Sequence, residues 1–243
     1  MLSSSPIRLA CLAAGLFAFL GCTDSASSVP APAREPEQHY LGDSPGGATV
    51  PPSGATWFVD QTEKSGVRFT VRNGRDGGHF TILESVGCGA ALFDLDQDGD
   101  LDLLIPGGGT ISRAIPPAIS GLPIGLFRNH GDGTFTNASE LVQWGGDPPY
   151  FHGAFVADFD RDGFPDVLLT GYGGCRLLRN NQGQKLVDVT EASKLALTEW
   201  TTAAAWGDVD RDGWADLFLV GYVDWNGTVD MSCGDARKQM RDV

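Results

Sequence analysis

The chain has 243 residues and a formal net charge of −14, with a sequence pI near 4.5. This balance disfavours a nucleic-acid or anionic-membrane partner and makes cations the natural counterpart. The 33 glycines and 14 prolines favour turns and short strands over long helices, in a chain long enough to bury a sizeable core.

The N-terminus has the pattern of an export signal. Arg8 precedes the apolar run LACLAAGLFAFL, which ends at Leu20 and is short for a membrane span but suits a signal peptide. The following Gly21-Cys22 resembles a bacterial lipobox with Cys22 as the lipidation site, and an ordinary secretory signal with an incidental cysteine is the other reading. We therefore expect residues 1–22 to direct export, giving an outer-membrane or periplasmic lipoprotein or a secreted protein.

Residues 23–56 are rich in Pro, Ala, Ser and Gly and nearly lack large apolar side chains. Such a segment cannot bury enough surface to order itself, so we expect a disordered linker. Residues 57–243 are then the folded part. Beyond the signal, the chain has three cysteines, an odd number: Cys88, Cys175 and Cys233. Cys88 with Cys175 is one possible disulfide, and small buried thiols are the default interpretation.

An acidic string occurs three times: FDLDQDGDLDLL from residue 93, FDRDGFPDVLL from 159 and VDRDGWADLFL from 209. Short apolar runs of buried-strand length, bounded by glycine, enter and leave each string. Each unit therefore predicts a small antiparallel sheet whose acidic loop joins two inner strands.

Two further marks recur with the acidic strings. One is WFVDQTEKSG, TFTNASELVQ and KLVDVTEASK; the other is the pair LFRNHGDGTF and LLRNNQGQKL. The unit is about 50 residues once one insertion is removed, GGGTISRAIPPAISGLPIG (107–125), which we interpret as a Pro/Gly-rich surface excursion. Units that cannot close their own core stack as propeller blades or as a solenoid.

Each acidic loop places aspartates at positions 1, 3, 5 and 9 and glycine at position 6. Their carboxylates, with the backbone carbonyl of position 7 and water, can supply the oxygens that Ca²⁺ requires. The candidate ligands are Asp94, Asp96, Asp98, Asp100 and Asp102 in the first loop; Asp158, Asp160, Asp162, Phe164 and Asp166 in the second; and Asp208, Asp210, Asp212, Trp214 and Asp216 in the third. Without a cation these charges would repel one another.

Other metal sites fit less well. An EF-hand needs a glutamate at position 12 and flanking helices, but position 12 is Ile105, Leu169 or Leu219. A DxD motif of a sugar-nucleotide transferase would not explain three copies. Calcium fits better than magnesium because the ligands are many, flexible and purely oxygen.

The three loops, with Gly-Ala before and Arg-Asn after each of the first two, resemble FG-GAP/VCBS repeats. The best-known structural relative of these repeats is the β-propeller of integrin α subunits. More narrowly, TEKSGV, GCGAALFDLDQDGDLDLL and LFRNHGDGTF resemble the ASPIC/UnbV-associated group and cartilage acidic protein. The resemblance covers residues 57 to about 225. It implies an all-β fold of propeller blades with calcium in the blade hairpins, and a role in adhesion, ligand binding or scaffolding.

A closed propeller needs more blades than three, so we expect this chain to be the N-terminal part of a longer propeller. The leading functional hypothesis is an exported calcium-binding module that binds a protein or glycan at a surface, without catalysis. The alternative is a propeller enzyme, a lyase or hydrolase, with its active site outside the calcium loops. A calcium-dependent periplasmic assembly factor is a third hypothesis.

Overall fold

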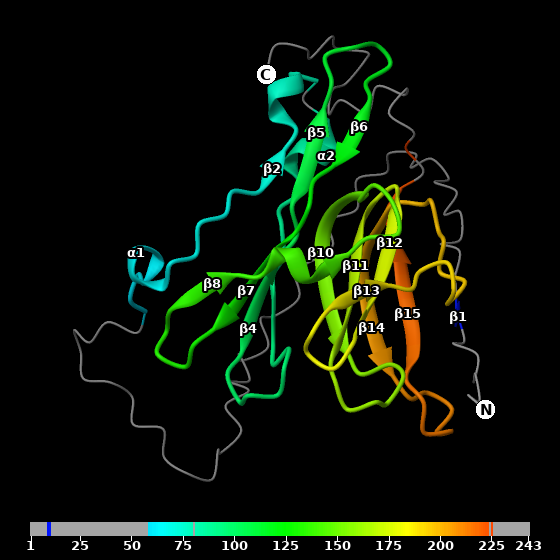
Figure 1. Cartoon of the computed structure of the whole chain (residues 1–243). Coiled ribbons are helices and arrows are strands. Elements are labelled where there is room, and N and C mark those ends of the chain that lie inside the picture. Colours follow the sequence, from blue (N-terminus) through cyan, green and yellow to red (C-terminus); the bar gives the residue numbers. More distant parts are fainter. Residues whose placement is uncertain (1–8, 11–57, 80, 224, 226–243) are drawn as a thin grey trace, which may run out of the picture. The chain divides into compact units, whose positions relative to one another are not determined.

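The computed structural model describes residues 9–10, 58–79, 81–223 and 225, and these are mostly β-strand (Figure 1). All the described strands belong to one unit of the chain, which comprises residues 1–11 and 61–243. Cys22, Cys233 and nearly all of the expected signal and linker lie outside the described residues.

Three successive sheets correspond to the three predicted units. Sheet 1 has the order β3 (Ala91–Phe93), β4 (Asp102–Ile105), β7 (Gly125–Asn129) and β8 (Phe135–Asn137). The centre of sheet 2 is β10 (Tyr150–Ala157), β11 (Asp166–Tyr172), β12 (Gly174–Asn180) and β13 (Leu186–Asp188). Sheet 3 is built on β14 (Thr201–Gly207) and β15 (Asp216–Gly221). The strands named within each sheet pair antiparallel.

Helices are short and peripheral. They are α1 (Thr62–Ser65), α2 (Ile82–Ser85) and two 3-10 turns, η1 (Arg75–Gly77) and η2 (Ser139–Leu141). A capping box begins α2, with Thr81 and Glu84 satisfying each other's backbone N–H groups. In the described part of the chain, no helix is long and apolar enough to span a membrane.

The acidic loops connect the first strand of each sheet to the second, as the sequence predicts. In sheet 2 both of these strands are inner strands, because β5 pairs with the far side of β10. In sheets 1 and 3, however, β3 and β14 lie at the edge. The expectation of two inner strands therefore holds only for sheet 2, since only there does another segment cover the first strand.

The insertion forms strands rather than an irregular excursion. Its hairpin of β5 (Gly108–Ile111) and β6 (Ile119–Gly121) joins sheet 2, where β2 (Arg72–Asn73) also pairs with β5. Gly109 allows this approach, because a Cβ there would lie 2.4 Å from the ring of Tyr150. Composition alone indicated a loop because Gly and Pro are common in both loops and hairpin turns.

Sheet 2 contributes side chains to two separate cores because successive residues of a strand face opposite ways. Along β11, Val167 and Leu169 pack in one core with Phe93 and Leu104 of sheet 1. Leu168, between them, packs in a second core with residues of β12, β15 and the turn after β13: Cys175, Leu177, Leu195, Leu217 and Leu219. The sheets thus stack through alternate faces of the central one.

Two short segments extend the sheets. β9 (Val142–Gln143) pairs parallel with β13, next to η2. β1 (Leu9–Ala10), within the predicted signal, pairs parallel with β15 at Leu217 and Phe218. β4 and β11 each pair with an antiparallel third strand, β7 and β12. Among the described residues, β15 has no equivalent antiparallel partner on that side.

The possible disulfide is not formed. Cys88 is exposed and Cys175 is buried, and both thiols are free. Burial raises the pKa of both thiols to about 11. The default interpretation of small buried thiols therefore holds for Cys175 and is wrong for Cys88, which is free but exposed.

A third core lies at the ends of the strands opposite the acidic loops. It gathers Leu83, Ile111, Tyr150, Trp200 and Trp225. At its margin His152 is 6% exposed, and its Nε2 accepts a hydrogen bond of 2.8 Å from the indole Nε1 of Trp200. Burial lowers the pKa of His152 to about 4, so the imidazole is neutral at neutral pH.

The burial of His152 predicts a loss of stability in acid. A histidine in the unfolded chain titrates near pH 6.5, so between that pH and about 4 the unfolded state binds a proton that the folded state does not. Above about pH 6.5, titration of His152 does not change the free energy of unfolding. As the pH drops toward 4, this free energy falls by up to roughly 3 kcal/mol. His152→Gln, which keeps an acceptor for Trp200, should remove this slope in urea titrations at pH 4–8. Exposed His130→Gln is the control and should keep it; parallel curves for wild type and His152→Gln would contradict the prediction.

Candidate metal centres

The three acidic loops share one backbone conformation. We call residues 94–102, 158–166 and 208–216 loops 1, 2 and 3. Position 4 is left-handed in each, with φ of 62°, 59° and 62° at Gln97, Arg161 and Arg211. The glycines at position 6, Gly99, Gly163 and Gly213, have φ of 94°, 95° and 88°, which L side chains rarely adopt. The repeated sequence therefore encodes a repeated turn.

The aspartates at positions 1 and 5 hold each turn together. In loop 1, Asp94 accepts hydrogen bonds from the backbone N–H groups of Asp98 and Gly99, at 3.1 and 3.0 Å. Asp98 accepts one of 2.9 Å from the N–H of Asp100. Loops 2 and 3 repeat these bonds at the same positions. The local sequence thus closes each turn with its own carboxylates.

The aspartate at position 9 anchors the loop to the sheet. Asp166 is 1% exposed and accepts hydrogen bonds from the N–H of Phe159 at 3.0 Å and of Asn180, on the third strand, at 2.7 Å. Asp102 does the same with Leu95 and Asn129. In loop 3, Asp216 accepts from Val209. Charge-assisted bonds to backbone amides hold each carboxylate in place.

Three carboxylates converge in every loop, from positions 1, 3 and 9. In each group one oxygen per residue lies within 4.8 Å of the others: Asp94, Asp96 and Asp102; Asp158, Asp160 and Asp166; Asp208, Asp210 and Asp216. Two unit charges at this separation repel by about 3 kcal/mol at an effective dielectric constant of 20. The fold therefore builds three concentrated negative sites that a divalent cation would neutralise.

Calcium fits this donor set. Oxygens on opposite sides of a Ca²⁺ at 2.3–2.6 Å are about 4.6–5.2 Å apart, which suits groups whose atoms lie within 4.8 Å. In loop 1, Asp96 Oδ1 is buried and has no hydrogen-bond partner, so it is an oxygen that a bound cation would satisfy. All donors are hard oxygens, which favours calcium over zinc or copper.

Burial and mutual repulsion favour protonation of these carboxyl groups. Burial, more than any neighbouring charge, raises the pKa of Asp102 and Asp160, and it raises that of Asp166 to about 7. The backbone hydrogen bonds act in the opposite direction. Since cation binding requires the ionised form, binding of a cation at loop 2 near pH 7 would be coupled to proton release.

The asparagine of each Arg-Asn mark braces its loop. Asn129 Nδ2 donates to the carbonyl of Leu101 at 2.9 Å, and Asn180 Nδ2 donates to the equivalent carbonyl, of Pro165, at 3.1 Å. Asn180 also reaches the preceding repeat, donating to the carbonyl of Leu95 at 2.8 Å. These asparagines explain why the mark recurs on the third strand of the sheet, β7 or β12, in each of the first two repeats.

Adjacent loops touch through their position-4 side chains. Gln97 Nε2 donates to the carbonyl of Gly163 in loop 2, at 2.6 Å. The guanidinium of Arg161 lies 5.5 Å from the ring centroid of Trp214 in loop 3, a cation–π contact. Each loop therefore contacts the next in chain order.

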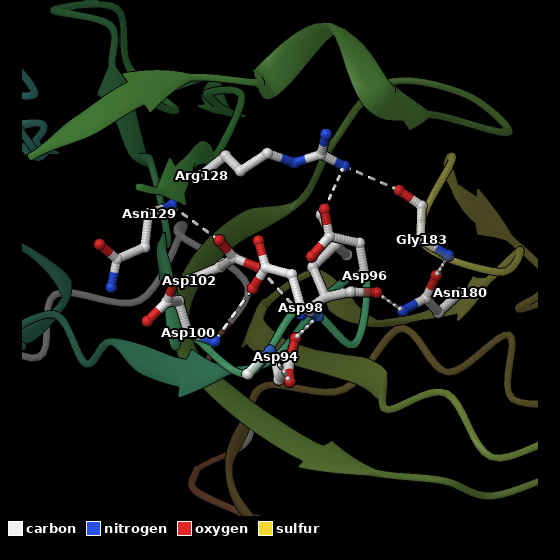
Figure 2. Close-up of polar contacts among 11 residues, drawn as sticks. Asp94, Asp96, Asp98, Asp100, Asp102, Arg128, Asn129, Asn180 and Gly183 are labelled. Carbon is white, nitrogen blue, oxygen red and sulfur yellow. Dashed lines mark hydrogen bonds and ion pairs between the residues drawn. The ribbon is translucent and has the colours of Figure 1, made fainter. Parts of the chain in front are cut away.

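An arginine links loop 1 to sheet 2. Arg128 on β7 places Nη2 3.1 Å from Asp96 Oδ2, and the same Nη2 donates to the carbonyl of Gly183 at 3.0 Å (Figure 2). Gly183, in the turn between β12 and β13, lies against Asp96 so closely that a Cβ would be 2.6 Å from Asp96 Cα. Figure 2 shows dashed lines from the end of the Arg128 side chain to both of these residues.

The predicted ligands divide into two groups. Positions 1, 3 and 9 are brought together, while the position-5 carboxylates Asp98, Asp162 and Asp212 bind the loop backbone. Coordination by position 5, and by the carbonyls of Asp100, Phe164 and Trp214, stays a prediction. Loop 3 is more open than the others, since Asp208 and Asp210 are exposed.

Sequence reasoning did not assign several residues that shape these sites. The Arg-Asn mark was visible as a repeat, but the anchoring roles of Asn129 and Asn180 depend on contacts across strands. Gln97 and Arg161 gave no signal, because position 4 differs between loops. Gly183 could be recognised only as a turn glycine, not as a neighbour of Asp96.

Comparison with known families agrees with this geometry. The sequence model of the FG-GAP-like repeat matches residues 94–169 and again residues 158–219, which together cover just over half of the chain. Both stretches begin at position 1 of an acidic loop, and the second ends just after loop 3. No match to a curated protein was found.

The contact between Gly183 and Asp96 predicts a specific sensitivity. Gly183→Ala would strain a backbone with φ of +72° and drive the new methyl group into Asp96. Gly133→Ala is the matched control, because Gly133 has φ of +81° but nothing within 4 Å of its would-be Cβ. In both variants, backbone strain should lower the free energy of unfolding by about 1–2 kcal/mol. Overpacking should lower it by roughly a further 1–3 kcal/mol in Gly183→Ala alone, as measured by denaturant unfolding. Equal losses for the two variants would show that the turn does not press on loop 1.

Proposed function

Because this chain belongs to the FG-GAP-like repeat family, we propose that it is a calcium-stabilised β-propeller module that binds a protein or glycan partner at a surface. The observation that carries the proposal is the convergence of three carboxylates in each of three equivalent loops. A structural cation in such loops contributes free energy of folding. We place the chain in the ASPIC/UnbV-associated group on its TEKSGV and acidic-loop motifs.

The propeller is proposed from the way the sheets stack. Sheet 2 is buried on both faces, by sheet 1 through Val167 and Leu169 and by sheet 3 through Leu168. The described residues contain no closed ring of blades. Phe218 and Val220 on β15 are 42% and 41% exposed, whereas their neighbour Leu217 is buried. That exposed face is where another blade would continue the same stacking.

Calcium would act as a brace rather than as a reagent. Asp94, Asp96 and Asp102 would hold the ion in loop 1, and the equivalent residues would hold it in loops 2 and 3. When bound, the ion neutralises repelling carboxylates and fixes the hairpin that joins the first two strands of a sheet. The hairpin ends would then form a rigid edge that can present side chains to a partner.

Binding is a better proposal than catalysis for the described residues. Every described histidine is engaged internally: His79 with the carbonyl of Ser112, His130 with Thr136 Oγ1 and His152 with Trp200. A propeller enzyme would need acid–base groups that converge outside the acidic loops. The alternative lyase or hydrolase role would place its active site elsewhere on the propeller.

Export forms part of the proposal. The apolar run after Arg8 and the FLGC sequence support delivery across a membrane, with Cys22 as the lipid-bearing residue in the lipoprotein form. An extracytoplasmic site would supply the millimolar calcium that modest-affinity loops need, with Kd on the order of 10⁻⁴ to 10⁻³ M.

Calcium should stabilise the folded chain. For one site with Kd of about 0.1 mM, 10 mM calcium adds roughly 2.7 kcal/mol to the free energy of unfolding. Thermal melting followed by circular dichroism should therefore show a clearly higher Tm in 10 mM calcium than in EGTA. Magnesium at the same concentration is the control and should give a much smaller shift. An equal Tm in 10 mM calcium and in EGTA would refute the structural role of calcium.

Removing two carboxylates from one loop should remove one calcium site. Asp160→Asn with Asp162→Asn keeps hydrogen-bond acceptors in loop 2 while deleting two charges. Calorimetric titration should then show one calcium equivalent fewer than wild type. The control is Asp147→Asn, an exposed aspartate outside the loops, which should leave the stoichiometry unchanged. An unaltered stoichiometry in the double variant would disprove the ligand assignment.

A further inference from the structure

A positive charge on β7, that of Arg128, is paired with one of the candidate ligands of loop 1. Arg128 Nη2 lies 3.1 Å from Asp96 Oδ2, and the two side chains are only 36% and 22% exposed. The pair is therefore largely shielded from water, where an ion pair is stronger than on an open surface. Figure 2 shows the Arg128 side chain above Asp96, with Asp94 at the bottom of the same cluster.

Hydrogen bonding alone does not explain the position of Arg128. Its Nε is buried and has no hydrogen-bond partner, and Asp96 Oδ1 is in the same condition. A buried donor without a partner costs free energy. The attraction between the guanidinium and the negative charge gathered in loop 1 must offset this cost.

The next repeat offers a natural comparison. Arg179 occupies the equivalent place in the second Arg-Asn mark, but it is exposed. Burial raises the pKa of Asp160, and the charge of Arg179 only partly opposes this rise. Among the described residues, Arg179 forms no ion pair within 4.0 Å. Loops 2 and 3 carry exposed arginines at position 4, Arg161 and Arg211, where loop 1 has the neutral Gln97. In loop 1, by contrast, Arg128 pairs directly with the convergent carboxylate Asp96.

We propose that Arg128 is a built-in counter-ion of loop 1, which keeps the loop folded without metal and thereby lowers its affinity for calcium. The inference rests on the calcium-binding role proposed above. Arg128 is a positioning residue in this view, because it acts on the ion through Asp96 and does not touch it.

The two effects have one electrostatic origin. Without metal, Arg128 offsets part of the repulsion among Asp94, Asp96 and Asp102. Asp96 Oδ2 is held by the guanidinium, whereas Oδ1 has no partner and would be the oxygen available to a divalent ion. Arginine could then stay in place, but the two cations would repel each other. Charges this close change a binding constant by roughly tenfold or more. Removing the charge should therefore destabilise the metal-free protein and tighten calcium binding.

The pair also ties metal binding to sheet packing. The same Nη2 that holds Asp96 donates to the carbonyl of Gly183 in the β12–β13 turn. Loss of Arg128 should therefore loosen the contact between sheets 1 and 2 in the metal-free form, and calcium should restore it in part.

The test isolates loop 1 in the full chain. Asp160→Asn, Asp162→Asn, Asp210→Asn and Asp212→Asn together disable loops 2 and 3. In this background, calcium is titrated by calorimetry with Arg128 intact, with Arg128→Gln and with Arg128→Lys, and Tm is measured in EGTA. We expect Arg128→Gln to lower the Kd about tenfold and to lower the Tm in EGTA. Arg128→Lys keeps the charge and should stay close to the parent, as should Arg179→Gln in sheet 2.

Each other outcome overturns the inference in a recognisable way. An equal or weaker calcium affinity in Arg128→Gln would show that arginine is structural or assists binding. A lysine variant that behaves like the glutamine variant would exclude charge as the cause. If the parent and Arg128→Gln both bind no calcium, the proposed role of loop 1 fails together with this inference. Binding in the parent with unchanged affinity in the variant would refute the inference alone.

Discussion

The repulsion among three carboxylates held within 4.8 Å is the constraint on which the rest of each repeat depends. A chain can keep such charges together only if other groups fix them, so nearly every polar contact around the loops serves that end. Backbone amides donate hydrogen bonds to Asp94 and Asp102. The positive φ angles of Gln97 and Gly99 make the turn tight enough for the amides of the loop to reach Asp94. The sheet supplies the frame, and a divalent cation would supply the missing positive charge.

The repeats are not independent of one another. Each loop makes contacts with the next: Gln97 reaches Gly163, Arg161 reaches Trp214, and Asn180 reaches back to Leu95. These contacts run alongside the two apolar cores on the faces of sheet 2. A change in one loop should therefore affect the neighbouring sheet. The three candidate sites are coupled to one another rather than independent.

The sequence predicts much of this arrangement because its signals are local. The aspartate spacing, the position-6 glycine and the flanking apolar runs lie within a dozen residues, and the structure confirms the strand–loop–strand units that they indicate. Contacts between repeats could not be predicted, since they depend on which residues of separate strands meet. Arg128 and Gly183 are 55 positions apart. The strands of the insertion were missed because turn-rich composition does not distinguish a loop from a hairpin.

The alternating faces of β11 limit how these repeats can evolve. Deleting one residue from this strand would move Val167 and Leu169 to the side of Leu168, and two cores would lose their side chains at once. Length changes are tolerable where the chain passes from one strand of a sheet to the next, as it does between Ile105 and Gly125, where the first repeat carries an added hairpin that joins sheet 2. Insertions and deletions among homologous genes should therefore cluster in the connection between the second and third strands and avoid the strands themselves.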